Sequence, residues 1–209
     1  ENLSLKIDFN GTINDFKSAI LIDGSFGAGK LFVRLDKDEN FLAKLSLQDF
    51  NLGRFINDTA RLGLVSLAIE TKGQGLAMEN IRASITGEVS SIYFNKYIYH
   101  ELIVDGSINN RKFQGEFSMN DKNAVIDFDG LVDFTPAQEQ FDFNLDVKHL
   151  DLFKLHFTDD DIQVGLTAKA DLTGISANTI KGIAGVTNLS VVQNGVKYEL
   201  DSLMITMSN

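Results

Sequence analysis

Cysteine and histidine, the side chains that most often bind zinc, are scarce in this 209-residue chain. It contains no cysteine, which excludes disulfides, zinc–thiolate sites and thiol nucleophiles. The three histidines, His100, His149 and His156, are scattered, and no pair has the i, i+4 spacing of a zinc-binding helix. His149 and His156 are seven residues apart and could share one face, but we interpret them as surface residues and expect no metal site.

One glycine-rich segment has the spacing of a phosphate-binding loop. Gly24 precedes Gly29 and Lys30 in a Gly-x4-Gly-Lys arrangement. However, Leu31 stands where the metal-binding Ser or Thr of such a loop is required, and no helical pattern follows. The segment therefore predicts a strand with small residues at a bend.

The remaining polar clusters also lack the features of a catalytic site. The run Asp159–Asp161 has neither the glycine nor the distal glutamate of a calcium loop, so we interpret it as a solvated turn. There is no Gly-x-Ser-x-Gly motif, and Ser, His and Asp are not grouped as in a hydrolase. We predict that the protein is not an enzyme and uses no cofactor.

Composition excludes several classes of partner. The net charge is −10, which argues against binding to nucleic acid and against a basic patch that docks on anionic lipid. Apolar residues make up 44% of the chain, including 16 Phe and no Trp, so the chain is globular rather than disordered. No run of 18 apolar residues is present that would predict a membrane-spanning helix.

The elements that position these side chains are strands, because apolar and polar residues alternate along nearly the whole chain. Leu3, Leu5, Ile7 and Phe9 alternate with polar residues, and Phe141, Phe143, Leu145 and Val147 do the same. Successive side chains of a strand point to opposite faces, so each run has one apolar and one polar side. The pattern predicts an all-β protein whose antiparallel sheet has a single apolar face.

The pattern also predicts where the strands end. We expect separate strands over 81–89 and 90–95, and over 97–105 and 107–119, with a turn at Asp105-Gly106. The alternation breaks at 49–56 and 149–155, where apolar residues are more closely spaced, and each break predicts a short helix.

These two breaks belong to a repeat of about 100 residues. Phe41, Leu45, Phe50 and Phe55 correspond to Phe141, Leu145, Leu150 and Leu155. We interpret residues 1–209 as one continuous β-domain, with one full copy at about 41–140 and a truncated copy at 141–209, excised from a longer chain. A sheet this large either curves into an open trough or folds into a β-sandwich, and we expect a long, strongly twisted and curved trough with one or two short helices.

The order of short motifs along the chain resembles that of a known family. The motifs include Asp49-Phe50-Asn51-Leu52, Gly73-Gln74-Gly75, Ile81–Gly87 and Phe94–Tyr99, followed by Ala124–Gly130 and His149-Leu150-Asp151-Leu152. This order resembles the AsmA-like proteins, and most closely the TamB (translocation and assembly module) proteins of Bacteroidota-type bacteria. The resemblance covers nearly the whole chain, although each motif alone consists of strand and turn residues.

The resemblance implies a segment of a periplasmic β-trough that is anchored in the inner membrane only through regions outside this sequence. Such proteins carry phospholipids between the inner and outer membranes or assist outer-membrane protein assembly, so the implied partners are phospholipid acyl chains and outer-membrane assembly proteins. The rival hypothesis is a structural β-domain with a closed core and a protein-binding role. The candidate groove residues are the apolar members of the most regular strands: Phe41, Leu45, Leu47, Ile81, Ile85, Phe113, Phe117, Ile126, Phe128, Phe141, Phe143, Leu145, Val164 and Leu166.

Overall fold

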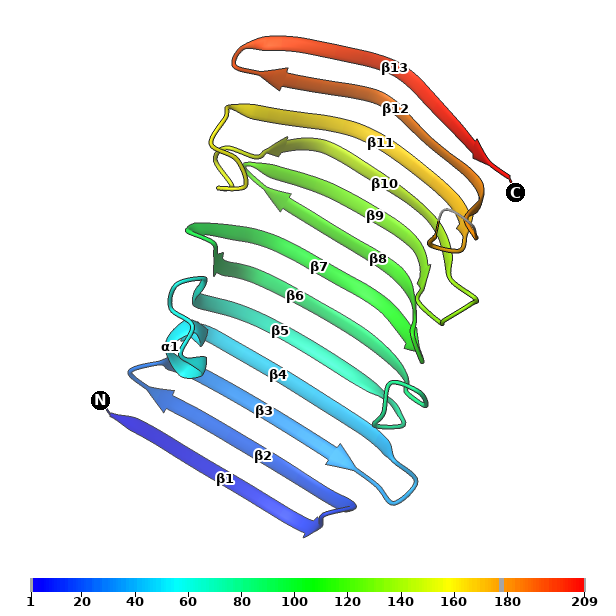
Figure 1. The fold of residues 1–209 in the computed structure, drawn as a ribbon. Coiled ribbons are helices and arrows are strands. Elements are labelled where there is room, and N and C mark those ends of the chain that lie inside the picture. Colours follow the sequence, from blue (N-terminus) through cyan, green and yellow to red (C-terminus); the bar gives the residue numbers. More distant parts are fainter. Residues whose placement is uncertain (1, 177–178, 209) are drawn as a thin grey trace. The chain divides into compact units, whose positions relative to one another are not determined.

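The computed structural model describes residues 2–176 and 179–208, and this part of the chain is all β apart from one short helix (Figure 1). Its elements, in chain order, are β1 (Leu3–Thr12), β2 (Asp15–Gly24), β3 (Gly27–Leu35), β4 (Asn40–Asn51), α1 (Leu52–Ile56), β5 (Leu62–Gln74), β6 (Arg82–Phe94), β7 (Tyr97–Asn109), β8 (Lys112–Asp121), β9 (Ala124–Asp133), β10 (Gln140–Asp151), β11 (Ile162–Thr173), β12 (Lys181–Gln193) and β13 (Val196–Met207).

The chain forms two compact units, Glu1–Asn110 and Arg111–Asn209. Unit 1 contains β1–β7 and unit 2 contains β8–β13. Within each unit every strand pairs antiparallel with the strand that follows it, so each unit is an open up-and-down sheet. The strands bend along their length, most visibly β11 to β13 (Figure 1). The expected curved antiparallel sheet is therefore confirmed.

Each sheet is a single layer. Among the described residues of either unit, extensive contacts join only strands that are neighbours in the ladder, together with α1 and β5. The exposed area is 13150 Å², whereas two compact domains of half the mass would together expose about 11,600 Å². The sandwich alternative is therefore wrong within each unit, because the described strands include no second sheet that packs on the apolar side.

The helix α1 forms at the corner between β4 and β5. Asn51 caps its first turn, because its side-chain oxygen accepts a hydrogen bond from the Arg54 backbone N–H at 3.0 Å. Asn57 ends it in the left-handed conformation, with φ 61°. Gly53 is required here, because a Cβ at this position would lie 1.9 Å from the backbone oxygen of Leu62.

Several local predictions were wrong. The predicted helix at 149–155 is absent: β10 continues to Asp151, and hydrogen-bonded turns follow, in which Leu155 N–H bonds to the Asp151 carbonyl. Likewise, the two strands expected over 81–89 and 90–95 are one strand, β6 (Arg82–Phe94), whose register with β5 is irregular. The predicted turn at Asp105-Gly106 lies inside β7, because Gly106 faces Ile85 in a regular ladder.

The same elements recur about 100 residues apart. β4, β5, β6 and β7 begin at 40, 62, 82 and 97, and β10, β11, β12 and β13 begin at 140, 162, 181 and 196. Both corners contain a register shift at the same place, between Leu47 and Phe50 and between Val147 and Leu150. β2 and β3 also correspond in order to β8 and β9. We therefore propose that each unit contains one six-stranded copy of the repeat, β2–β7 in unit 1 and β8–β13 in unit 2. This boundary differs from the expected one, in which the second copy begins at residue 141.

Candidate functional site

Most apolar side chains in the strands of unit 1 lie on one face of its sheet. Directly paired residues of antiparallel strands lie on the same face, so the strand registers can be followed across all seven strands. One such row across the sheet consists of Ile7, Ile20, Leu31, Leu45, Ile69, Gly87 and Val104. The adjacent rows through Leu47, Ala43 and Phe41 are also free of charged residues. We call these four rows the apolar face of unit 1.

Unit 2 has an equivalent face. One row contains Phe117, Phe128, Leu145, Ala168, Val186 and Leu203. The next row includes Gly130 and Phe143, which are paired, and a Cβ on Gly130 would lie 2.4 Å from the Phe143 Cβ. The glycine therefore lets the β10 backbone at Asp142 and Phe143 approach closely. The Phe143 ring lies 5.6 Å from the Phe128 ring. We call these rows, with the one through Phe113, the apolar face of unit 2.

The registers place ten of the fourteen candidate groove residues on these two faces, and three more, Ile126, Val164 and Leu166, on the same side of the unit 2 sheet outside the named rows. Phe41, Leu45, Leu47 and Ile85 lie on the apolar face of unit 1. The nine candidates from Phe113 to Leu166 lie on the apolar side of the unit 2 sheet. Ile81 lies just before β6 rather than in a strand, although its carbonyl accepts a hydrogen bond from Asn110.

All fourteen candidates are partly exposed, neither buried nor fully open to solvent. The buried apolar residues of the described chain number only eight, and several of these lie at corners: Phe50, Val65, Ala83, Tyr99, Ala124, Val147, Leu155 and Ala170. A sheet face inside a closed core would instead bury its large side chains almost completely. The apolar faces are therefore not covered by any other described residues of their own unit.

Sequence reasoning missed many members of the apolar face of unit 1. Ile20, Leu31 and Ile69 lie in the same row as Leu45, and Ile7 lies at its outer end on β1. The sequence did indicate that each of these residues lies on the apolar side of its own strand, because each belongs to a segment in which apolar and polar residues alternate. Alternation alone did not say which faces of different strands coincide, and strand register supplies this link.

The corner formed by α1 closes one end of the apolar face of unit 1. Phe55 of α1 packs edge-on against Phe50 at 5.3 Å between ring centroids, and against Phe26 at 6.3 Å. The guanidinium of Arg54 lies 5.3 Å from the centroid of the Phe26 ring. Phe55 is still 54% exposed, so this corner presents an aromatic edge to solvent beside the sheet.

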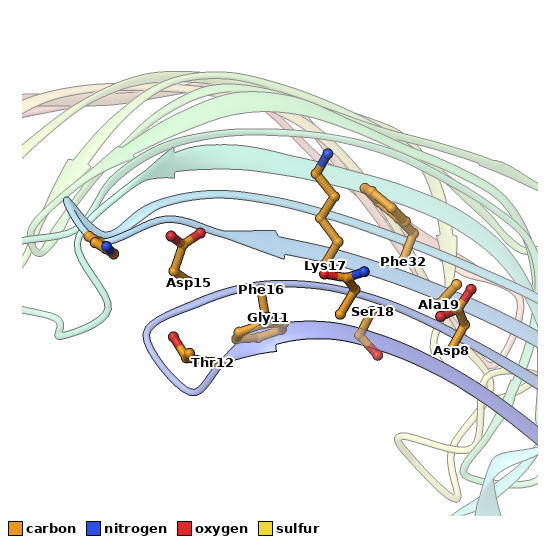
Figure 2. A pocket seen from close by; sticks show the side chains of 11 residues that line it. Asp8, Gly11, Thr12, Asp15, Phe16, Lys17, Ser18, Ala19 and Phe32 are labelled. Atoms are coloured by element: carbon orange, nitrogen blue, oxygen red, sulfur yellow. The ribbon is translucent and has the colours of Figure 1, made fainter.

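The side of the unit 1 sheet opposite its apolar face carries the charged residues Lys30, Lys44 and Glu70, and we call it the charged side. Depressions are found on this side. One of about 630 Å³ lies over β1–β3, where Lys17, Ala19 and Phe32 line it (Figure 2). Ala19 pairs with Phe32, so these side chains share the face that carries Asp8, and Figure 2 shows Lys17 and Phe32 rising from the same side. A second depression, of about 530 Å³, extends over β2–β6 on this side. The space available on the charged side was not anticipated from the sequence.

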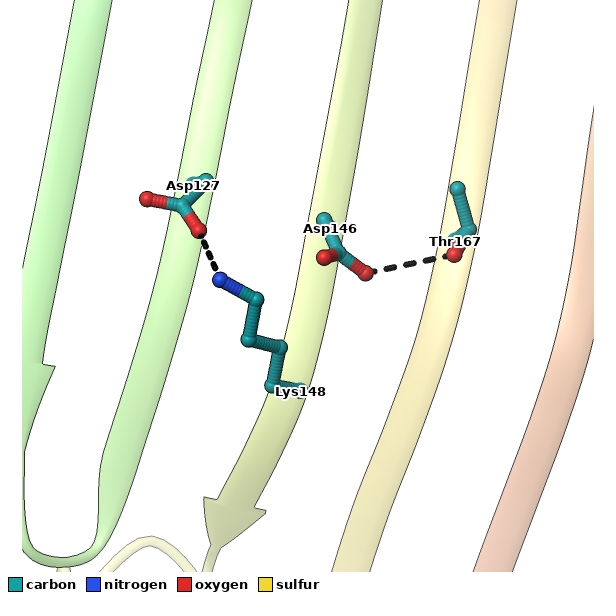
Figure 3. Close-up of polar contacts among 4 residues, drawn as sticks. All are labelled: Asp127, Asp146, Lys148 and Thr167. Atoms are coloured by element: carbon teal, nitrogen blue, oxygen red, sulfur yellow. Dashed lines mark hydrogen bonds and ion pairs between the residues drawn. The ribbon is translucent and has the colours of Figure 1, made fainter.

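The charged side of unit 2 contains an ion pair and a carboxylate that accepts a hydrogen bond from a neighbouring strand. The Lys148 ammonium lies 2.6 Å from Oδ2 of Asp127, and the Thr167 hydroxyl donates to Oδ1 of Asp146 at 3.2 Å (Figure 3). The hydrogen bond with Asp127 and the negative charge of Asp127 raise the pKa of Lys148. The ammonium thus compensates one of two directly paired carboxylates, Asp127 and Asp146.

Asp142 and Asp171 form another directly opposed carboxylate pair on this side, and both are exposed. Like charges at such positions repel each other across the ladder. We expect Asp171→Lys to stabilise unit 2 by about 0.2–1 kcal/mol at low salt, and less at high salt, because a repulsive pair becomes an attractive one. Chemical denaturation would measure this change. Asp171→Asn is the control and should gain less; a destabilised Asp171→Lys variant would contradict the expectation.

The segments that resembled catalytic motifs have structural positions. Gly24 ends β2 and Gly27 begins β3, so the Gly24–Lys30 segment contains a hairpin turn between two strands rather than a bend within one strand. His149 lies in β10, whereas His156 follows in the turn with φ 62°. Across the described residues, no three His, Cys, Asp or Glu side chains are grouped so as to hold a metal ion.

Comparisons of the chain with protein-family models, with curated proteins and with solved structures gave no match. None of the helical structure in residues 2–176 and 179–208 is long and apolar enough to cross a membrane. We therefore infer function from the geometry of the two sheets.

Proposed function

We propose that the apolar faces bind lipid acyl chains, and that the chain is a non-enzymatic segment of a periplasmic lipid-carrying groove of the AsmA-like or TamB kind. The observation that carries this proposal is a broad uncharged face with no part of its own unit packed over it. Without a bound guest, water contacts the rows through Leu45 and Leu145. A bound acyl chain would remove that apolar area from water, at about 0.8 kcal/mol per CH₂ group.

The size of the face suits such a guest. Seven strands spaced about 4.8 Å apart make each row of unit 1 about 29 Å long. A bilayer core of about 30 Å contains two leaflets, so one acyl chain spans about 15 Å. A chain lying across the strands therefore fits on unit 1 alone. The hydroxyl-bearing side chains in the four rows, those of Ser18 and Thr71, are uncharged. Apolar contacts have no preferred direction, so an acyl chain could slide along the face.

We expect the chain, purified without detergent from cells, to retain phospholipid. Extraction with organic solvent followed by mass spectrometry would identify the lipid, and a fluorescent hydrophobic probe should compete with it. A protein that is free of lipid and does not bind the probe would contradict the proposal. That outcome would favour the rival function, a structural β-domain whose apolar face is covered by a partner protein.

A further inference from the structure

One row on the apolar face of unit 1 has short side chains between two rows of longer ones. On β2 to β5 this row contains no side chain larger than valine, whereas the next row toward the α1 corner has only Leu and Ile on these strands. We call the short row the furrow; it consists of Ser18, Val33, Ala43 and Thr71. The row toward α1 is Ile20, Leu31, Leu45 and Ile69, and the row on the other side includes Phe16, Leu35 and Phe41.

The furrow has a defined length. Phe9 pairs with Ser18 at one end, and Ile85 pairs with Thr71 at the other, so a larger side chain bounds the furrow at each end. Four strands spaced about 4.8 Å apart place Ser18 and Thr71 about 14 Å from each other. This matches the length of one acyl chain, about 15 Å. The furrow therefore accommodates one extended acyl chain lying across the strands.

The furrow also contains a buried hydroxyl group without a partner. Ser18 is only 9% exposed, and among the described residues its hydroxyl has no hydrogen-bond partner. Its oxygen is not completely enclosed, so a ligand on the apolar face can reach it. The Thr71 hydroxyl, by contrast, donates to the Ser84 carbonyl at 2.9 Å. Because a buried hydroxyl without a partner is unfavourable, Ser18 favours a ligand that brings a hydrogen-bond acceptor.

The surroundings of Ser18 decide which acceptor is suitable. None of the four rows of the apolar face contains a charged side chain. A carboxylate bound there would lose its hydration without gaining an opposite charge. An ester carbonyl is neutral, and one hydroxyl donor satisfies it. The position of Ser18 at one end of the furrow suits a ligand whose acceptor lies at the end of an acyl chain.

We propose that the furrow binds one acyl chain of an ester-linked phospholipid, and that the Ser18 hydroxyl donates a hydrogen bond to the ester carbonyl. The chain then runs from Ser18 past Ala43 toward Ile85. This proposal rests on the proposed function, acyl-chain binding, and adds the position, the direction and the chemical linkage of the bound lipid.

The equivalent row of unit 2 lacks both features. Gly115 pairs with Gly130 as Ser18 pairs with Val33, so no hydroxyl is present at the equivalent position. Phe143 stands 100 residues after Ala43 and places a large ring in the middle of the row. A preference for an ester therefore reports on unit 1.

The test compares two soluble lipids that differ only in their linkage. Lysophosphatidylcholine has one acyl ester, and its ether-linked analogue of equal chain length keeps the chain and headgroup but lacks the carbonyl. Calorimetry on the 209-residue chain, below the micelle-forming concentration of each lipid, gives both affinities. The unmodified chain should bind the ester about two- to ten-fold more tightly than the ether. Ser18→Ala should remove this preference by weakening the ester alone, whereas Ser46→Ala, on the charged side, should keep it.

A second variant tests the position of the chain. Ala43→Leu fills the middle of the furrow and should weaken binding of both lipids by about ten-fold. Ala68→Leu adds the same group on the charged side and should change neither affinity. Circular dichroism verifies the β content of each variant.

The outcomes separate this proposal from acyl-chain binding in general. Equal affinity for ester and ether, or a preference that survives Ser18→Ala, would overturn the role of Ser18 and leave the proposed function intact. Unchanged binding by a folded Ala43→Leu variant would overturn the placement of the chain. Binding of neither lipid would overturn this proposal and the proposed function together. The ratio of the two affinities in the unmodified chain is decisive even if a variant does not fold.

Discussion

Replacing Leu45 by aspartate is expected to weaken binding of a fatty acid or a fluorescent acyl probe to unit 1 by at least about ten-fold. Leu45 lies at the centre of the apolar face, between Leu31 and Ile69 of the neighbouring strands. An acyl chain lying there would have to strip water from the new carboxylate, which is strongly unfavourable in apolar surroundings. Without a guest, the carboxylate remains hydrated, because position 45 is partly exposed.

The matched control is Ser46→Asp, which adds the same charge one residue further along β4. Ser46 is exposed on the charged side, beside Lys30. We expect this variant to bind the probe like the unmodified chain. Titration by fluorescence or calorimetry, with circular dichroism to verify the β content, separates the two. Equal loss of binding in both variants would show that the probe does not use the apolar face, and unfolding of Leu45→Asp alone would show that Leu45 is a core residue.

Replacing Asp151 by alanine is expected to destabilise unit 2 by about 1–3 kcal/mol. The Asp151 side chain is 1% exposed, and its Oδ1 accepts a hydrogen bond from the Lys154 backbone N–H at 3.0 Å. The Lys154 ammonium lies 3.1 Å from Oδ2. Alanine would leave the Lys154 N–H without this acceptor, in the turn that buries Leu155 completely. Chemical denaturation at neutral pH would measure the loss.

The repeat supplies a conservative variant for this position. Asn51 accepts the equivalent hydrogen bond from Arg54 at 3.0 Å, so Asp151→Asn should keep the cap and lose only the charge. This variant should therefore lie between Asp151→Ala and the unmodified chain. An Asp151→Ala chain as stable as the unmodified one would show that the carboxylate does not support the corner.

The pH dependence of this contribution has a definite sign. Burial raises the pKa of Asp151, but the hydrogen bond from Lys154 and the charges of Lys154 and His149 outweigh it, so the pKa lies below its ordinary value of 3.8. A lowered pKa in the folded state stabilises the protein above about pH 3.8, and the contribution is lost as the pH falls through the folded-state value. The difference between Asp151→Asn and the unmodified chain should therefore shrink in acid.

The corners show why part of the fold could not be read from the sequence. Residues 49–56 and 149–155 have similar apolar spacing, yet only the first contains a helix. Both begin with a side chain that caps the next turn, Asn51 or Asp151, so the local signal is nearly the same. The first corner also places Phe55 against Phe26 and Phe50, whereas Leu155 is buried in its turn. The corners also differ at one small residue, because Gly53 stands where the second corner has Phe153, so apolar spacing alone did not distinguish helix from turn.

The sequence by itself determined that the chain is built of antiparallel strands and which residues of each strand share a face, because side-chain direction alternates with every residue. It could not determine that Ile20, Leu31 and Ile69 lie in one row with Leu45, because this depends on the register between strands. Nor could it decide between sandwich and open sheet, because an apolar strand face has the same residues whether or not a second layer covers it. Only the tertiary structure left these faces uncovered within each unit.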